Sequence, residues 1–307
     1  MKLKNGGPMT NKIPHSPEKS IATNGITLVY DTFGKRDAEP LLLIQGLSWQ
    51  MIMWDDDFCR ALAAHGYYVI RFDNRDIGRS TKLDAAGVPD IAALFTALMK
   101  GEKVTVPYLI SDMADDTFGL LDGLEIESAH VVGFSMGGMI GQTMALNRPN
   151  RVRTLTSMSS TTGNPALPPP TPEALSVITV PPPSDRAGFI DYFLNMWRIL
   201  NGRLSVDNTR VVRYAELTYD RGNHTAGIAR QIAAINASGS RKDALGSVTV
   251  PSLVIHGDAD PLLPVACGID TAEAIPGAQL LIIEGGGHTL PEPVWDKVLG
   301  AIVVHTQ

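Results

Sequence analysis

The sequence has little of several features that mark specialised classes of protein. Two cysteines, Cys59 and Cys267, occur among its 307 residues, so neither a disulfide framework nor a cysteine-rich zinc site is predicted. No apolar run approaches the roughly 18 residues that a membrane-spanning helix requires. Basic residues are not in excess: 26 Lys and Arg against 32 Asp and Glu give a net charge of −6, which argues against a nucleic-acid partner. We expect a cytoplasmic protein that does not insert into membranes.

The first twenty residues combine charge with proline and lack the apolar stretch of a secretory signal. We therefore expect a flexible tail over residues 1–20. Apolar residues make up 44% of the whole chain, a usual share for a globular protein with a buried core. The length allows one large domain or two small ones.

Short apolar runs recur along the chain and predict the fold class. They lie at residues 41–46, 67–73, 130–135, 152–158, 252–258 and 279–285. Their apolar residues are consecutive, which is typical of strands buried on both faces of a parallel sheet. Helical patterns separate them, around residues 54–65, 112–123, 137–148, 265–275 and 292–304. This alternation predicts an α/β fold with a mostly parallel central sheet flanked by helices, and residues 26–34 are expected to add an antiparallel edge strand.

The alternation stops over residues 161–247. Eight of the 21 prolines fall between Pro165 and Pro183, a density that predicts neither regular helix nor central strand. Three helical patterns follow, at residues 188–202, 206–221 and 225–239. We expect residues 161–247 to form a helical cap, inserted after the sixth strand, above the strand ends where such sheets bind ligands. Residues 21–160 and 248–307 would then form one core.

A candidate nucleophile lies in the run Gly133-Phe134-Ser135-Met136-Gly137, which matches G-x-S-x-G between a predicted strand and a predicted helix. A serine hydroxyl is a poor nucleophile and must be held toward a base. A sharp strand-to-helix turn does this, and glycines on both sides remove side chains that would collide. Met136 would begin the helix, so its free N–H group would point at the negative charge that develops during the reaction. The alternative is a glycine-rich turn with an idle serine.

A nucleophilic serine requires a histidine, and the histidine requires a carboxylate that orients it. His288 follows three glycines directly after the last predicted strand, which indicates a base at the sheet edge. Asp258 and Asp260 follow the strand before it, and both are candidate acids. A metal site formed by these two and His256 is an alternative. Residues 159–163, after the strand preceding the cap, hold no carboxylate, which removes the main competing position for the acid.

These pieces together resemble the α/β-hydrolase superfamily over nearly the whole chain from about residue 24. The family's acid motif is similar to residues 257–264, and the likeness implies Asp260 rather than Asp258 as the catalytic acid. It also implies a second oxyanion donor, the N–H group of Leu47, although Gln45 stands where the family usually has histidine. The run DNRDIGRS resembles the family's loop after the neighbouring strand, and we expect its charged residues to hold loops rather than to touch substrate.

The runs YDTFG, DNRDIGRS and MWRILNG are similar to a branch of bacterial hydrolases that includes aclacinomycin methylesterase, a likeness that implies ester cleavage but does not fix the substrate. We expect no cofactor and no metal. We therefore expect a serine carboxylesterase, acting through Ser135, His288 and Asp260 and an acyl-enzyme on small to medium apolar esters. Relatives with the same triad include methylesterases of bulky natural products, lactonases, C–C bond hydrolases and thioesterases. A binding protein on a hydrolase scaffold is the alternative from a different class.

Several apolar residues are candidates for the substrate pocket, and each could equally belong to the core. They are Gly46, Leu47, Trp49, Met51, Met53, Phe134, Phe193, Met196 and Trp197. The expected partner is a small-molecule ester, and a homodimer is left open.

Overall fold

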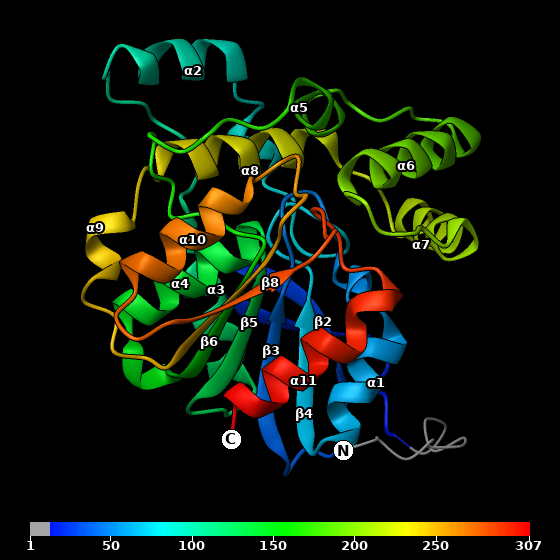
Figure 1. Ribbon diagram of the computed structural model, residues 1–307. Helices are drawn as coiled ribbons and strands as arrows, with labels where there is room; N and C mark the ends of the chain where they lie inside the picture. Colours follow the sequence, from blue (N-terminus) through cyan, green and yellow to red (C-terminus); the bar gives the residue numbers. More distant parts are fainter. Residues whose placement is uncertain (1–12) are drawn as a thin grey trace.

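The computed structural model describes residues 13–307, and Figure 1 shows its arrangement. Of the flexible tail expected over residues 1–20, the first twelve residues lie outside the described part. The remainder differs from that expectation: the ring of His15 stacks on Phe33 with centroids 3.9 Å apart, and Nε2 of His15 lies 3.0 Å from a carboxylate oxygen of Asp31. The first strand already begins at Lys19. These contacts join residues distant in sequence, so the local composition did not indicate them.

Within residues 13–307, eight strands form one sheet in the order β1-β2-β4-β3-β5-β6-β7-β8. The strands are β1 (Lys19–Thr23), β2 (Ile26–Phe33), β3 (Glu39–Ile44), β4 (Tyr67–Phe72), β5 (Ala129–Phe134), β6 (Val152–Met158), β7 (Ser252–Gly257) and β8 (Gln279–Ile283). All pairs from β4 to β8 are parallel, while β1 and β2 are antiparallel. The predicted α/β fold is confirmed. The edge, however, is formed by β1 rather than by β2. The sequence did not predict β1, because this short and mostly exposed strand has only a weak apolar pattern.

Helices cover both faces of the sheet (Figure 1). They are α1 (Asp56–Ala64), α3 (Ile110–Gly123), α4 (Met136–Asn147), α10 (Val265–Ala274) and α11 (Trp295–His305). Leu41 and Leu43 of β3 pack in the cluster that contains residues of α1 and α11. Leu42 and Ile44 point the other way, into the cluster that contains residues of α3 and α4. This alternation explains why the strands are apolar at consecutive positions.

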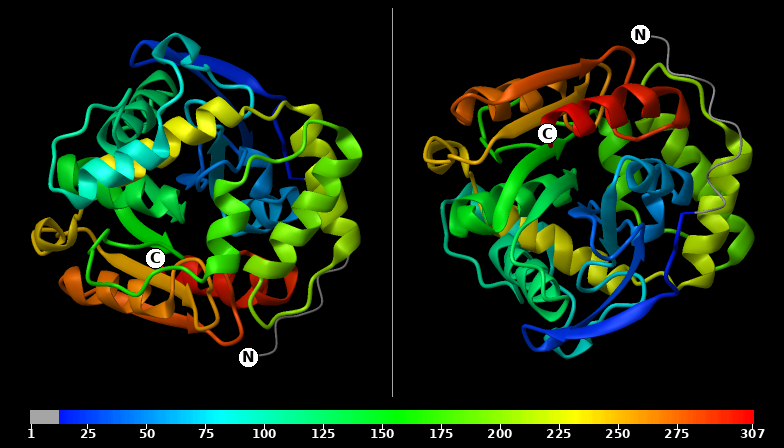
Figure 2. Two further views of the ribbon diagram at one scale, coloured as in Figure 1. Left: turned by 90° about the horizontal axis from the view of Figure 1, so that it is seen from above. Right: turned by 90° about the horizontal axis from the view of Figure 1, so that it is seen from below.

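The segment between β6 and β7 holds α5 (Pro172–Thr179), α6 (Arg186–Leu200), α7 (Asn208–Asp220), α8 (Thr225–Ala237) and the short α9 (Lys242–Leu245). Four of them, α5 to α8, lie above the carboxyl ends of the strands, where α8 crosses the sheet edge (Figures 1 and 2). A further helix, α2 (Ile91–Met99), contacts α8. Four 3₁₀ turns lie in the described part of the chain: Met51–Met53, Asp84–Ala86, Pro149–Arg151 and Glu292–Val294. Among residues 13–307, no helix is both long and apolar enough to cross a membrane.

Three of these helices were not predicted: α2, α5 and the four-residue α9. The proline-rich segment was expected to contain no regular helix, yet α5 begins at Pro172. The expectation is wrong because proline is tolerated in the first turn, where its missing N–H group would have no partner. Thr171 caps that turn by accepting a hydrogen bond from the N–H group of Ala174. Helix α2 was missed because its residues are nearly all apolar and show no helical period.

Candidate active site

Ser135 lies at the turn from β5 into α4, with its backbone in a strained conformation. Its φ is 54°, a left-handed value that a non-glycine residue rarely adopts. The turn is tight: a Cβ atom added to Gly133 would overlap the backbone of Gly137, and one added to Gly137 would overlap the carbonyl oxygen of Ile44. The glycines of the motif therefore let α4, β5 and β3 approach one another closely.

Three polar side chains form a continuous hydrogen-bonded line. Nε2 of His288 lies 2.9 Å from Oγ of Ser135, and its Nδ1 lies 2.7 Å from Oδ2 of Asp260. The other carboxylate oxygen accepts hydrogen bonds from the N–H groups of Leu262 (2.9 Å) and Leu263 (2.8 Å). All three side chains are buried. A serine is thus paired with a base, and the base with an orienting carboxylate, which is the arrangement that nucleophilic catalysis by serine needs.

The two candidate acids are separated by their contacts. Asp258 pairs with Arg203 at 2.9 Å. Its Oδ1 also accepts a hydrogen bond from the N–H group of Gly285 at 2.7 Å. Asp258 therefore holds the glycine-rich loop that precedes His288, whereas Asp260 contacts His288 itself. The carboxylate of Asp258 thus has partners other than those of Asp260.

Two backbone N–H groups belong to segments next to Ser135. Met136 is the first residue of α4, and Leu47 follows β3 in the next loop. Within residues 13–307, neither N–H group donates a hydrogen bond to another protein group. The loop lies close, since a Cβ atom on Gly46 would be 3.0 Å from Cβ of Ser135. Free donors beside a nucleophile are what an oxyanion requires.

The charged residues of the loop after β4 hold other segments, as expected. Nε and Nη2 of Arg75 donate hydrogen bonds to the two carboxylate oxygens of Asp116 in α3, each at 2.6 Å. Asp76 accepts hydrogen bonds from Arg230 of α8 at 2.8 and 2.7 Å. Both pairs are buried, and both join the loop to a helix.

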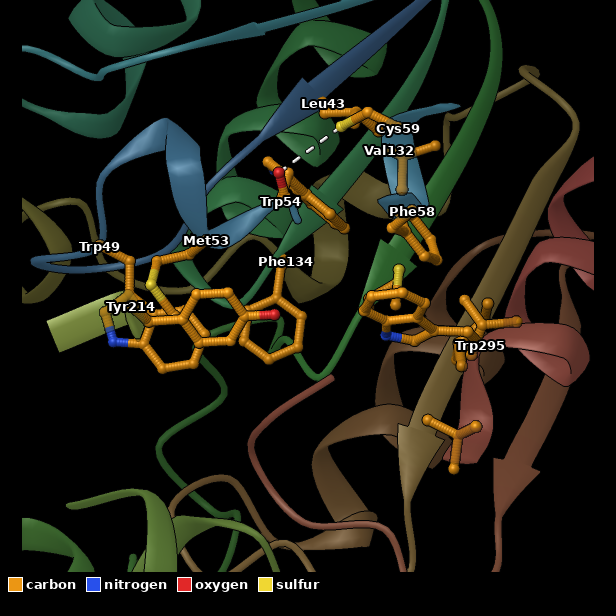
Figure 3. Close-up of a cluster of buried hydrophobic side chains, with 14 of the residues drawn as sticks. Leu43, Trp49, Met53, Trp54, Phe58, Cys59, Val132, Phe134, Tyr214 and Trp295 are labelled. Atoms are coloured by element: carbon orange, nitrogen blue, oxygen red, sulfur yellow. Dashed lines mark hydrogen bonds between the residues drawn. The ribbon is translucent and has the colours of Figure 1, made fainter. Parts of the chain in front are cut away.

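Aromatic side chains extend from the site into the core and into residues 161–247, which we name the cap segment (Figure 3). Phe134, the neighbour of Ser135, lies 5.5 Å from the nearly parallel ring of Trp49. Trp49 in turn lies 6.1 Å from Trp197 of α6, and on the other side Phe134 meets the edge of Trp54. Phe193, Met196 and Met53 are buried in the same cluster. Six of the candidate pocket residues therefore lie in one apolar cluster with core side chains: Trp49, Met53, Phe134, Phe193, Met196 and Trp197. Leu47 packs against the cluster on the other side of the sheet.

A cavity of about 210 Å³ opens beside the apolar cluster that contains Trp197. It lies between the cap segment and the loop after His288, and its lining includes Trp197, Tyr214, Arg210 and Leu290. The indole N–H of Trp197 is buried without a hydrogen-bond partner in the described part of the chain. Of these lining residues, Tyr214, Arg210 and Leu290 were not predicted, because nothing in the sequence near them indicated that the cap segment folds back onto this loop.

Residues 39–292 match the family described as the alpha/beta hydrolase fold. The chain belongs to that family. It is 31% identical to rhodomycin D methylesterase DnrP of Streptomyces peucetius, over 95% of this chain and 98% of that protein. It is 26% identical to a putative carbamate hydrolase, RutD, of Variovorax paradoxus, over 85% of this chain and 89% of the other.

Solved structures agree on the fold of this hydrolase. The meta-cleavage product hydrolase CumD of Pseudomonas fluorescens superposes with a TM-score of 0.72 at 23% identity, covering 94% of this chain and 96% of that one. Est816, described as an enzyme that degrades N-acyl homoserine lactones, superposes with a TM-score of 0.67 at 25% identity, covering 92% and 99%.

A second histidine of the hydrolase lies next to the candidate acid. His256 is fully buried, and its Nε2 is 2.7 Å from the carbonyl oxygen of Leu263 and 3.6 Å from Oδ2 of Asp260. Burial lowers the pKa of His256, although the neighbouring carboxylate acts in the opposite direction. Among residues 13–307, no group of three or more His, Cys, Asp or Glu side chains is arranged to hold a metal ion, so the alternative set of His256, Asp258 and Asp260 does not form such a site.

Proposed function

We propose that this protein is a serine hydrolase that cleaves carboxylic esters. The observation that carries the proposal is the hydrogen-bonded line from Asp260 through His288 to Ser135. His288 takes the proton of Ser135 as Oγ bonds to the ester carbonyl carbon, and Asp260 stabilises the resulting imidazolium. The carbonyl oxygen becomes an oxyanion, which the N–H groups of Leu47 and Met136 receive.

Collapse of this intermediate breaks the bond to the alcohol oxygen, which leaves with the proton held by His288. Water then attacks the acyl-enzyme, again giving up a proton to the imidazole. Release of the acid returns the proton to Ser135, so no cofactor is consumed. Loss of one oxyanion donor would lower the rate by about 10²- to 10³-fold.

The substrate we propose is an ester with an apolar acyl group and a small alcohol. Burial of the triad beneath the segment 161–247 and the aromatic cluster around Phe134 support the apolar acyl group. The relatives named as methylesterases support the small alcohol. We propose that the segment 161–247 is a cap and that Gly46, Trp49, Phe134, Phe193, Met196 and Trp197 contribute to the pocket.

Replacement of the nucleophile tests the proposal. Ser135→Ala should abolish hydrolysis of p-nitrophenyl butyrate and of methyl esters of aromatic acids, with an unchanged melting temperature. Lactones, thioesters and C–C hydrolase substrates assayed in parallel would separate the alternatives that use the same triad. A Ser135→Ala enzyme that still turns over the preferred ester would refute the mechanism. A wild-type enzyme that prefers a C–C substrate would refute the ester assignment alone.

A further inference from the structure

The loop that carries Leu47, residues 45–53, is held from the side of the cap segment. We call it the oxyanion loop. Its Ser48 has a φ of 64°, a strained value that must be maintained by contacts. The N–H group of Ser48 donates a hydrogen bond to Oε1 of Gln231 at 3.0 Å. Ser48 follows Leu47 directly, so this bond orients the peptide next to the candidate oxyanion donor.

Gln231 joins three segments through one side chain. It belongs to α8 and is fully buried. While its Oε1 accepts from the oxyanion loop, its Nε2 donates to the carbonyl oxygen of Arg75 at 2.9 Å. Both ends of the amide are thus used, which fixes its orientation. A buried amide with both ends paired is held in one rotamer.

The position of α8 is itself fixed against the loop after β4. A Cβ atom on Gly227 would overlap the carbonyl oxygen of Asp76, so the helix backbone lies directly on that loop. One turn later, Arg230 forms its buried ion pair with Asp76. Gly227, Arg230 and Gln231 have the spacing i, i+3, i+4 and lie on one helix face. These contacts fix the position of α8, and so they also fix the position of Gln231 beside Ser48.

A second contact between the cap segment and the oxyanion loop lies further along. Nε2 of Gln50 donates to the carbonyl oxygens of Thr218 (3.0 Å) and Gly222 (2.9 Å), and Arg221 donates to its Oε1 at 2.8 Å. This anchor holds the end of the loop that lies beyond Ser48. Of these contacts between the cap segment and the oxyanion loop, only the hydrogen bond to Gln231 involves Ser48, the residue next to Leu47.

We propose that Gln231 is a positioning residue for the oxyanion site: by fixing Ser48 it aims the N–H group of Leu47 at the developing oxyanion. The inference rests on the proposed function. It assigns to the cap segment a part in the catalytic step as well as in covering the site. Since this chain has Gln45 where relatives usually have histidine, Gln231 supplies a brace for the loop from another element.

The test compares two buried glutamines. Gln231→Met removes both hydrogen bonds of the amide with little change in volume. The matched control is Gln142→Met in α4, because Gln142 is equally buried and makes two comparable bonds, to Ser157 at 3.2 Å and from Arg241 at 3.1 Å. Neither partner belongs to the oxyanion loop. Both variants should lose similar stability, measured as urea midpoints.

Gln231→Met should lower kcat by about 10- to 100-fold, less than complete loss of an oxyanion donor, with KM within about threefold because ground-state binding is unaffected. Gln142→Met should keep kcat within about threefold of wild type. Amide hydrogen exchange of residues 45–53 should be faster in Gln231→Met alone. Equal kcat values for the two variants, or a change confined to KM, would overturn the inference.

Labelling by a fluorophosphonate separates this inference from the ester assignment. In that reaction Oγ of Ser135 bonds to phosphorus, fluoride leaves, His288 takes the proton, and the phosphoryl oxygen occupies the oxyanion site. The labelling rate should fall about 10- to 100-fold in Gln231→Met, even if the chosen esters are poor substrates. A wild-type enzyme that is labelled but cleaves no ester contradicts only the proposed substrate. Equal labelling of the two variants contradicts the role of Gln231.

Discussion

Nε2 of His288 lies 2.9 Å from Oγ of Ser135, although 153 residues separate them in the sequence. Ser135 is held by the tight turn after β5. His288 is held partly by the cap segment, since its N–H group donates to the carbonyl oxygen of Leu200, the last residue of α6, at 2.6 Å. The position of Ser135 therefore depends on the core, whereas the position of His288 depends in part on the cap segment.

The first prediction concerns the acid. Asp260→Asn should reduce kcat by about 10⁴-fold, because an amide holds the imidazole in the wrong tautomer and does not stabilise its cation. Asp258→Asn should stay within about tenfold, because that residue holds a loop and does not contact His288. Initial rates with p-nitrophenyl butyrate measure both. A severe loss in Asp258→Asn with a mild one in Asp260→Asn would reassign the acid.

The second prediction concerns two glycines of different surroundings. Gly137→Ala should lower the free energy of unfolding by about 1–3 kcal/mol or more, because the new methyl group overlaps the backbone of β3. Gly300→Ala should raise it by about 0.5–1 kcal/mol, since Gly300 lies within α11 with open space where the Cβ atom would be. Urea unfolding measures both. Equal effects at the two positions would contradict the tight turn at Ser135.

The third prediction concerns the ion pair between α8 and the loop after β4. Arg230 and Asp76 are both fully buried, so Arg230→Met should cost about 3–5 kcal/mol by leaving a carboxylate without its partner. The surface control is Arg186→Met, whose partners Glu216 and Asp220 are exposed; it should cost about 1 kcal/mol or less. Similar unfolding midpoints for the two variants would show that the buried pair adds little to the docking of α8.

The fourth prediction concerns pH. Burial lowers the pKa of His256 in the folded protein, whereas the imidazole of an unfolded chain titrates near 6.5. Below that value the unfolded chain binds more protons, so the free energy of unfolding should fall as the pH drops. The fall ends once the pH is below the lowered pKa of the folded state. His256→Gln should make this dependence shallower between about pH 7 and pH 5.

Urea midpoints across this range measure the pH dependence. Burial also lowers the pKa of His130 and of His305, so part of the slope should persist in His256→Gln. His65→Gln, at the exposed end of α1, is the control and should leave the slope as in wild type. An unaltered slope in His256→Gln would contradict a neutral His256 in the folded protein.

Local signals in the sequence predicted much of this protein. Consecutive apolar residues predicted the parallel strands because burial on both faces leaves a direct mark on each strand. The motif around Ser135 and the glycines before His288 predicted side chains at one sheet edge, because parallel strands end their loops on the same side. The assignment of these residues to catalysis stays a prediction that the experiments above address.

The tertiary structure decided what depends on contacts between distant segments. Pairing with β2 made a strand of residues 19–23, which have almost no apolar pattern. The first-turn position of Pro172 allowed a helix where proline density argued against one. No local pattern distinguishes Gln231 from any other helical glutamine; its role follows from α8 docking on the loop after β4, which brings its amide to Ser48. Such contacts depend on how the elements pack against one another. The residues of one segment do not indicate which other segment it will contact.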